Sequence, residues 1–133
     1  HGVGARSALP ESRSGYKAVN YISDMATAYL AADLIIARSG AVTCAEVNTL
    51  GRYALFIPLP IGNGEQNLNA ASLISQGRAE ILPQAQFTAE WIAANLSRLL
   101  ARSSAAPISG STIDIEATTK IVALMDYALS GGK

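Results

Sequence analysis

The run Ser39-Gly40-Ala41-Val42-Thr43 stands between a short apolar segment and a run of good helix formers. The first N–H groups of a helix have no intrahelical partner, and the helix dipole adds positive charge at that end. A strand-to-helix turn of this kind binds anions, phosphate above all. Gly40 would let a phosphate approach the backbone closely, in a turn that could also call for a positive φ. The alternative is structural, because Ser-Gly is common in turns of every kind.

Glu46 adds a second chemical group to this turn. It follows Thr43 by three residues, so both side chains lie on one helix face, and the longer one leans towards the helix N-terminus. A carboxylate in that place can accept hydrogen bonds from both hydroxyls of a ribose while phosphates occupy the turn. The alternative is a solvated helix glutamate, which is the commoner case. Cys44 is predicted to be a small packed residue, since no base in the sequence marks it as a nucleophile.

A second polar cluster, Glu65, Gln66 and Asn69, follows a loop in which two glycines flank Asn63. Glycines permit positive φ at successive positions, and loops with that freedom often bind ligands. Spacings of three and four residues put Asn69 on one helix face with Gln66 or Glu65. Polar side chains of this kind suit sugar hydroxyls, and ordinary capping of the helix is the alternative.

The elements that must position these groups form an α/β pattern. Between residues 19 and 82 short apolar runs alternate with helical patterns, which is typical of βα units and a parallel sheet. The fold predicted is a Rossmann-like parallel sheet flanked by helices, although the sequence has neither a GxGxxG fingerprint nor a Walker loop. The expected strands are 19–22, 34–37, 54–57 and 79–82, the expected helices 24–32, 41–50, 65–75, 88–101 and 112–129, and the expected surface loop 102–111.

Composition excludes several classes of function. Half of the residues are hydrophobic, 15% are charged, and ten basic residues balance ten acidic ones, so residues 1–133 are predicted to form one folded domain that binds no nucleic acid. One cysteine and one histidine are too few for a zinc cluster. No apolar run approaches the roughly 20 residues that span a bilayer. We therefore expect a cytosolic domain without a metal and, because the chain opens at His1, a fragment.

Four blocks of the sequence, in this order, resemble one enzyme family. Together they are similar to the lipid II-forming N-acetylglucosaminyltransferases of bacteria, GT-B enzymes of family 28, and the last block is similar to their actinobacterial form. The resemblance is to the C-terminal, donor-binding half of these enzymes. The blocks are Tyr21-Ile22-Ser23-Asp24-Met25, Ala31-Ala32-Asp33-Leu34, Arg38-Ser39-Gly40-Ala41-Val42-Thr43 with Glu46, and residues 58–70.

The resemblance implies an inverting transfer of GlcNAc from UDP-GlcNAc to lipid I, with neither metal nor cofactor. At the matching positions, the backbone of Ile22 would read the uracil edge and Glu46 would hold the ribose. The diphosphate is expected at Ser39, Gly40, Ala41, Val42 and Thr43, and the donor sugar at Glu65, Gln66 and Asn69.

The family also has an N-terminal domain, which carries the acceptor site and the surface that meets the inner membrane. That domain is expected to be absent here, together with the first strand and helix of the C-terminal domain. Lipid I and the membrane are therefore partners expected only of the full-length enzyme, and no catalytic residue is assigned. The sequence departs from the family pattern at Arg52-Tyr53, where a small residue and proline are usual, and at Val3, where a polar residue is common.

Two other functions remain open from the sequence. The chain would also suit a donor-binding subunit of a two-chain N-acetylglucosaminyltransferase, which has no activity by itself. It would suit another GT-B enzyme that uses a UDP-sugar, although a UDP-GlcNAc 2-epimerase would need further catalytic carboxylates and histidines.

Overall fold

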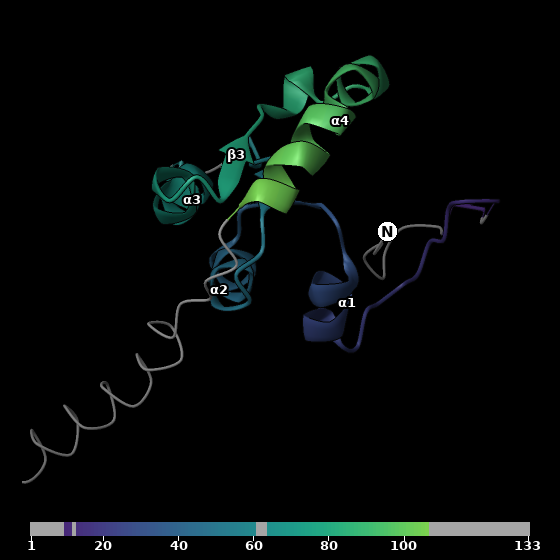
Figure 1. The fold of residues 1–133 in the computed structure, drawn as a ribbon, viewed down its shortest axis with the longest axis horizontal. Coiled ribbons are helices and arrows are strands. Elements are labelled where there is room, and N and C mark those ends of the chain that lie inside the picture. Colours follow the sequence, from purple (N-terminus) through teal and green to yellow (C-terminus); the bar gives the residue numbers. More distant parts are fainter. Residues whose placement is uncertain (1–9, 12, 61–63, 107–133) are drawn as a thin grey trace, which may run out of the picture.

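The computed structural model describes residues 10–11, 13–60 and 64–106, which are coloured in Figure 1. Val3 and the expected helix 112–129 lie outside these residues. Among the helices that are described, none is both long enough and apolar enough to cross a membrane.

Three short parallel strands form the sheet, in the order in which they occur along the chain. Ile35 lies opposite Ala54, and Ala54 lies opposite Ala79, so the three strands are in line at their amino ends. Parallel neighbours need a crossover between them, and a helix supplies each one. The predicted fold class is therefore confirmed. The strands are β1 (Ile35–Ala37), β2 (Ala54–Phe56) and β3 (Ala79–Ile81).

The helices begin or end at residues that favour helix termini, either side-chain caps or turn glycines. Asp24 accepts a hydrogen bond from the Thr27 N–H at 3.0 Å, and Thr88 accepts one from the Trp91 N–H at 3.1 Å. Gly51, with φ 65°, follows the end of the second helix. The elements are α1 (Met25–Ala31), α2 (Ala41–Thr49), α3 (Glu65–Ser75), the 3₁₀ turn η1 (Gln84–Gln86) and α4 (Ala89–Ala105).

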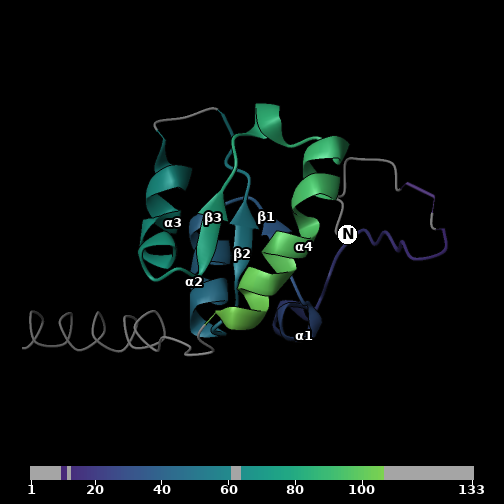
Figure 2. The same cartoon turned by 45° about the horizontal axis from the view of Figure 1, so that its top comes forward.

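The sheet separates two apolar clusters. Alternate residues of β2 face opposite sides: Phe56 packs with the helices α1 to α3, whereas Leu55 packs with α4. Figure 2 shows α4 in front of the sheet and α2 behind it. The first cluster contains Tyr29, Ile35, Cys44, Val47, Ala54, Phe56, Ala70, Leu73 and Ala79, and the second contains Tyr53, Leu55, Ile57, Leu82 and Leu99.

Two of the predicted elements are wrong. Residues 19–22 form no strand beyond a single β-bridge at Val19, and Tyr21 in their middle is 82% exposed, so this segment does not have the two covered faces of an inner strand. The helix expected to end at Ala101 continues to Ala105, and the predicted loop 102–111 therefore begins inside α4. Tertiary contacts hold this last turn, because the Ser103 hydroxyl donates to the Asp33 carbonyl at 2.6 Å.

Arg52 and Tyr53, which depart from the family pattern, take part in the packing of the helices. The Tyr53 hydroxyl donates to Glu80 Oε1 at 2.5 Å, and Arg52 donates to the Ala32 carbonyl. Both residues lie directly before β2, and their contacts reach β3 and the end of α1, away from the turn between β1 and α2. The departure therefore concerns how these elements are attached to one another.

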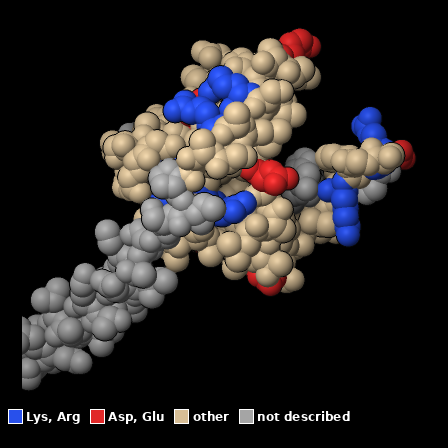
Figure 3. Space-filling view, viewed as in Figure 1, with Lys and Arg blue, Asp and Glu red and all other residues tan. Residues whose placement is uncertain are grey.

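Glu80, in the middle of β3, forms ion pairs with two arginines of α4. Arg98 Nη1 lies 2.8 Å and Arg102 Nη1 2.9 Å from Glu80 Oε1. Figure 3 shows the basic side chains gathered over α4. Partial burial acts to raise the pKa of Glu80, but the hydrogen bonds from Arg98 and Tyr53 outweigh it and lower that pKa. Burial and the neighbouring Glu80 raise the pKa of Tyr53 well above its usual range.

Candidate functional site

Two loops meet at the carboxyl edge of the sheet, because β1 and β2 are adjacent and parallel. Arg38, directly after β1, donates to the carbonyls of Ile57 at 2.9 Å and Pro58 at 3.2 Å. The side-chain amide of Asn69, on α3, donates to the Ser39 carbonyl at 3.1 Å. These bonds tie the β1–α2 turn to the loop after β2 and to α3.

The N-terminus of α2 is open. Gly40 is the N-cap, no side chain caps the helix, and the Cys44 N–H makes the first intrahelical bond with the Gly40 carbonyl at 2.9 Å. The N–H groups of Ala41, Val42 and Thr43 therefore precede the first helical hydrogen bond. Val42 is 72% exposed, so this end of the helix faces solvent. The geometry is that of an anion-binding helix terminus.

Gly40 does not adopt the positive φ that its place in the turn could have required. Gly40 has φ −65° and ψ 152°, an extended conformation that is ordinary for an N-cap. A β-carbon built on Gly40 has no atom within 4 Å. The protein itself therefore does not require glycine here, and any such requirement must come from a ligand.

Ser39 is fully buried beside this helix end, with 0% of its surface exposed. Its hydroxyl has no hydrogen-bond partner among the residues that the structure describes. A buried hydroxyl without a partner costs about 1–3 kcal/mol. Such a group at the entrance of α2 is a feature of a binding site more than of a packed core.

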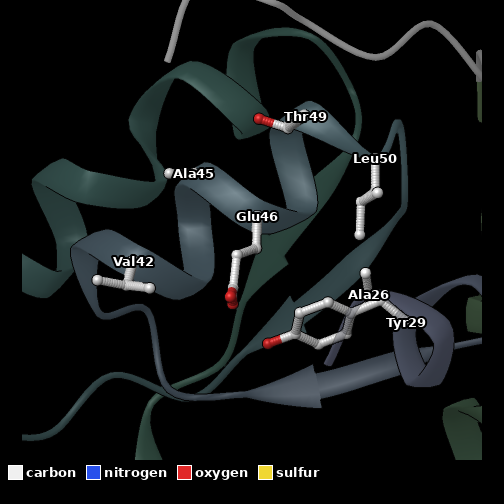
Figure 4. A pocket seen from close by; sticks show the side chains of 7 residues that line it. All are labelled: Ala26, Tyr29, Val42, Ala45, Glu46, Thr49 and Leu50. Atoms are coloured by element: carbon white, nitrogen blue, oxygen red, sulfur yellow. The ribbon is translucent and has the colours of Figure 1, made fainter. Parts of the chain in front are cut away.

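Glu46 lines a cavity of about 400 Å³ between α1 and α2, shown in Figure 4. Tyr29 reaches it from α1 and is 8% exposed, and in Figure 4 the phenol and the Glu46 carboxylate point towards one another. Burial and the charge of Glu46 raise the pKa of Tyr29, while the neighbouring Thr43 side chain acts to lower it. The cavity is lined by Ala26, Tyr29, Val42, Ala45, Glu46, Thr49 and Leu50.

The three polar residues of α3 have different surroundings. Gln66 Oε1 accepts a hydrogen bond from the Leu59 N–H at 2.9 Å, which braces the loop before the helix. Glu65 is exposed in the first turn, directly after Gly64, whose φ is 76°. None of the described side chains caps the N-terminus of α3, so the described residues do not support the capping alternative for this cluster. Gln66 and Asn69 instead hold two neighbouring loops.

Ile22 lies just before α1 and not at the end of a strand. It is half-buried, and no described residue hydrogen-bonds to its backbone. The backbone N–H and C=O of Ile22 are thus compatible with recognition of the uracil edge, and this role stays a prediction. The structure brings Asn69 to the turn at Ser39, and Tyr29 to Thr43 and Glu46. No hydrogen bond in the described part of the chain links Ile22 or Glu65 to that turn.

Two residues that the sequence analysis did not assign belong to this region. Arg38 lies in one of the four sequence blocks that resemble the family, but no binding role was predicted for it. In the structure it braces the loop after β2. Tyr29 lies in an Ala-rich helix. The only sequence feature that could have pointed to it is the presence of an aromatic residue in a short amphipathic segment. Within residues 13–60 and 64–106, no three His, Cys, Asp or Glu side chains gather as metal ligands would.

Comparisons with known proteins agree with this geometry. A model of the glycosyltransferase family 28 C-terminal domain matches residues 4–123. The crystal structure of Acinetobacter baumannii MurG is similar with a TM-score of 0.58 and 42% sequence identity, over 65% of this chain and 25% of that one.

Two curated relatives carry the name UDP-N-acetylglucosamine--N-acetylmuramyl-(pentapeptide) pyrophosphoryl-undecaprenol N-acetylglucosamine transferase. The one from Corynebacterium efficiens is 51% identical over 88 residues, which are 66% of this chain and 24% of its own length. The one from Streptomyces coelicolor is 40% identical over 106 residues, 76% of this chain and 29% of its own. The chain thus spans about a quarter of the length of these relatives.

Proposed function

Because the chain belongs to glycosyltransferase family 28 as a C-terminal domain, we propose that it is the donor-binding part of a lipid II-forming enzyme. In this proposal the enzyme transfers GlcNAc from UDP-GlcNAc to lipid I with inversion, and it uses no metal. Lipid I and the inner membrane surface would be bound by other parts of the full-length enzyme, at the cytoplasmic face. The names of the two curated relatives support this activity.

The observation that carries the proposal is the open N-terminus of α2 beside the unpartnered hydroxyl of Ser39. N–H groups and the helix dipole together favour a diphosphate. A phosphate oxygen would also give the buried hydroxyl an acceptor. The diphosphate is therefore proposed to bind at Ser39, Gly40, Ala41, Val42 and Thr43.

The remaining groups of the donor are assigned around this anchor. Glu46, one turn further along α2, would accept hydrogen bonds from the ribose hydroxyls, and the backbone of Ile22 would read the uracil. The donor sugar would lie near the first turn of α3, which Asn69 ties to the Ser39 carbonyl at 3.1 Å. Its hydroxyls would be bound or oriented by Glu65, Gln66 and Asn69.

The first prediction is that the isolated chain binds UDP and UDP-GlcNAc weakly and turns over neither, because donor contacts are present without an acceptor site. Titration calorimetry with UDP, UDP-GlcNAc and GDP measures this. GDP is the matched control, since it has the same diphosphate and ribose with another base. Equal affinity for GDP and UDP would contradict uracil recognition at Ile22, and transfer to a lipid I analogue would contradict the donor-only role.

The second prediction concerns Gly40→Val. The backbone conformation accepts valine and the β-carbon meets nothing, so we expect folding to lose only about 1 kcal/mol from the poorer N-cap. UDP binding should lose more, at least about 1–2 kcal/mol, because the branched side chain would occupy the approach to the helix N–H groups. Thermal unfolding with and without UDP separates the two effects.

The smaller change Gly40→Ala should lie between the wild type and Gly40→Val. A Gly40→Val protein that keeps the whole UDP-dependent rise in melting temperature would place the phosphates elsewhere. The assignment of the diphosphate to the N–H groups of residues 41–43 would then also be withdrawn.

A further inference from the structure

Among the described residues that line the cavity between α1 and α2, Tyr29 is the one aromatic side chain. Its ring belongs to the core cluster under the sheet, and only 8% of the residue is exposed. Its hydroxyl, however, is directed to the cavity and towards the carboxylate of Glu46 (Figure 4). A buried phenol needs a hydrogen-bond partner, and in this place the available partners are side chains of α2.

The surroundings of this hydroxyl join two parts of the site. Tyr29 interacts with Thr43, in the first turn of α2, and with Glu46, one turn further on. The two neighbours act on the pKa of Tyr29 in opposite directions. Burial and the charge of Glu46 raise this pKa and so favour the neutral phenol, which can donate to a carboxylate, whereas the Thr43 side chain acts to lower it.

We propose that Tyr29 is a positioning residue, whose hydroxyl holds the Glu46 carboxylate in the cavity in the orientation that binds a ribose diol. The inference rests on the proposed function, because it concerns the same nucleotide. Tyr29 lies on α1, whereas Glu46 lies on α2. Recognition of the ribose would therefore depend on how α1 packs against α2.

Physical chemistry favours such a brace. A glutamate on a helix has several rotatable bonds, and a ligand that fixes them loses binding free energy to side-chain ordering. A carboxylate has about four lone-pair sites, so one bond from Tyr29 leaves acceptors for two hydroxyls. The core anchors the phenol ring, which makes it a rigid donor.

The test is Tyr29→Phe, which keeps the ring in the core and removes only the hydroxyl. Calorimetry with UDP and with 2′,3′-dideoxy-UDP measures its effect on both ligands. We expect the Kd of UDP to rise about three- to tenfold and the Kd of dideoxy-UDP to stay unchanged, because only the diol meets Glu46. In a Glu46→Ala background, Tyr29→Phe should change neither Kd.

The matched control is Tyr53→Phe, which removes a buried hydroxyl bonded to Glu80 on the opposite side of the sheet. It should lower thermal stability without changing either Kd. An unchanged Kd of UDP in Tyr29→Phe overturns the inference alone, as does an equal loss for both ligands, which would make Tyr29 a packing residue. A wild-type chain that binds no UDP overturns the proposed function and this inference together.

Discussion

Replacing Arg78 by methionine is expected to lower the free energy of unfolding by about 2–4 kcal/mol, the largest stability effect of any substitution proposed for this chain. Arg78 is 1% exposed. Its guanidinium donates to the carbonyls of Val47 and Asn48, each at 3.0 Å, and to Asn48 Oδ1 at 3.0 Å. Methionine fills similar space but leaves these oxygens without that donor.

The position of these acceptors explains why the effect should be large. Val47 and Asn48 belong to the last turn of α2, where their carbonyls accept from the guanidinium as well as from the N–H groups of Arg52 at 3.0 Å and Gly51 at 3.1 Å. A cation there also meets the negative end of the helix dipole. Arg78 additionally donates to Gln76 Oε1 at 3.3 Å and to the Arg52 carbonyl at 3.4 Å, so it connects the end of α2 with the end of α3 and with the turn before β2.

Urea unfolding of Arg78→Met, Arg78→Lys and Arg98→Met measures this prediction. Lysine keeps the charge but has fewer donors in a different geometry, so it should recover part of the loss. Arg98 is half-exposed and pairs with Glu80 at the surface, so Arg98→Met should cost at most about 1 kcal/mol. An Arg78→Met protein no less stable than Arg98→Met would show that the carbonyl contacts contribute little.

Replacing Glu46 by alanine is expected to weaken UDP binding by about 1–3 kcal/mol, because the ribose diol would lose a charged acceptor. The helix should persist, since alanine is the better helix former. Calorimetry with the chain measures the affinity, circular dichroism measures the fold, and the KM for UDP-GlcNAc reports the same loss in the full-length enzyme.

The control for this substitution is Glu90→Ala, another helix glutamate, which is exposed in the first turn of α4. It should leave UDP binding unchanged. If Glu46→Ala unfolds while the wild type binds dideoxy-UDP as tightly as UDP, Glu46 is a structural residue. The ribose assignment would then be withdrawn.

Local patterns were enough to predict most of the secondary structure. Asp24 and Thr88 start α1 and α4, and α3 has the predicted bounds. The turn from β1 into α2 was also predicted, because a short apolar run followed by Ser-Gly and good helix formers is decided within a few residues. The predicted fold and family followed from the order of such local signals, and both are confirmed.

Tertiary structure decided what depends on neighbours distant in sequence. Whether residues 19–22 pair in a sheet depends on a partner strand, and the last turn of α4 depends on Asp33 and Glu80. The contact of Tyr29 with Glu46 requires α1 to pack beside α2, and the bond of Asn69 to Ser39 requires α3 beside the β1–α2 turn. Propensity acts along the chain, whereas a binding site is made by side chains that only packing brings together.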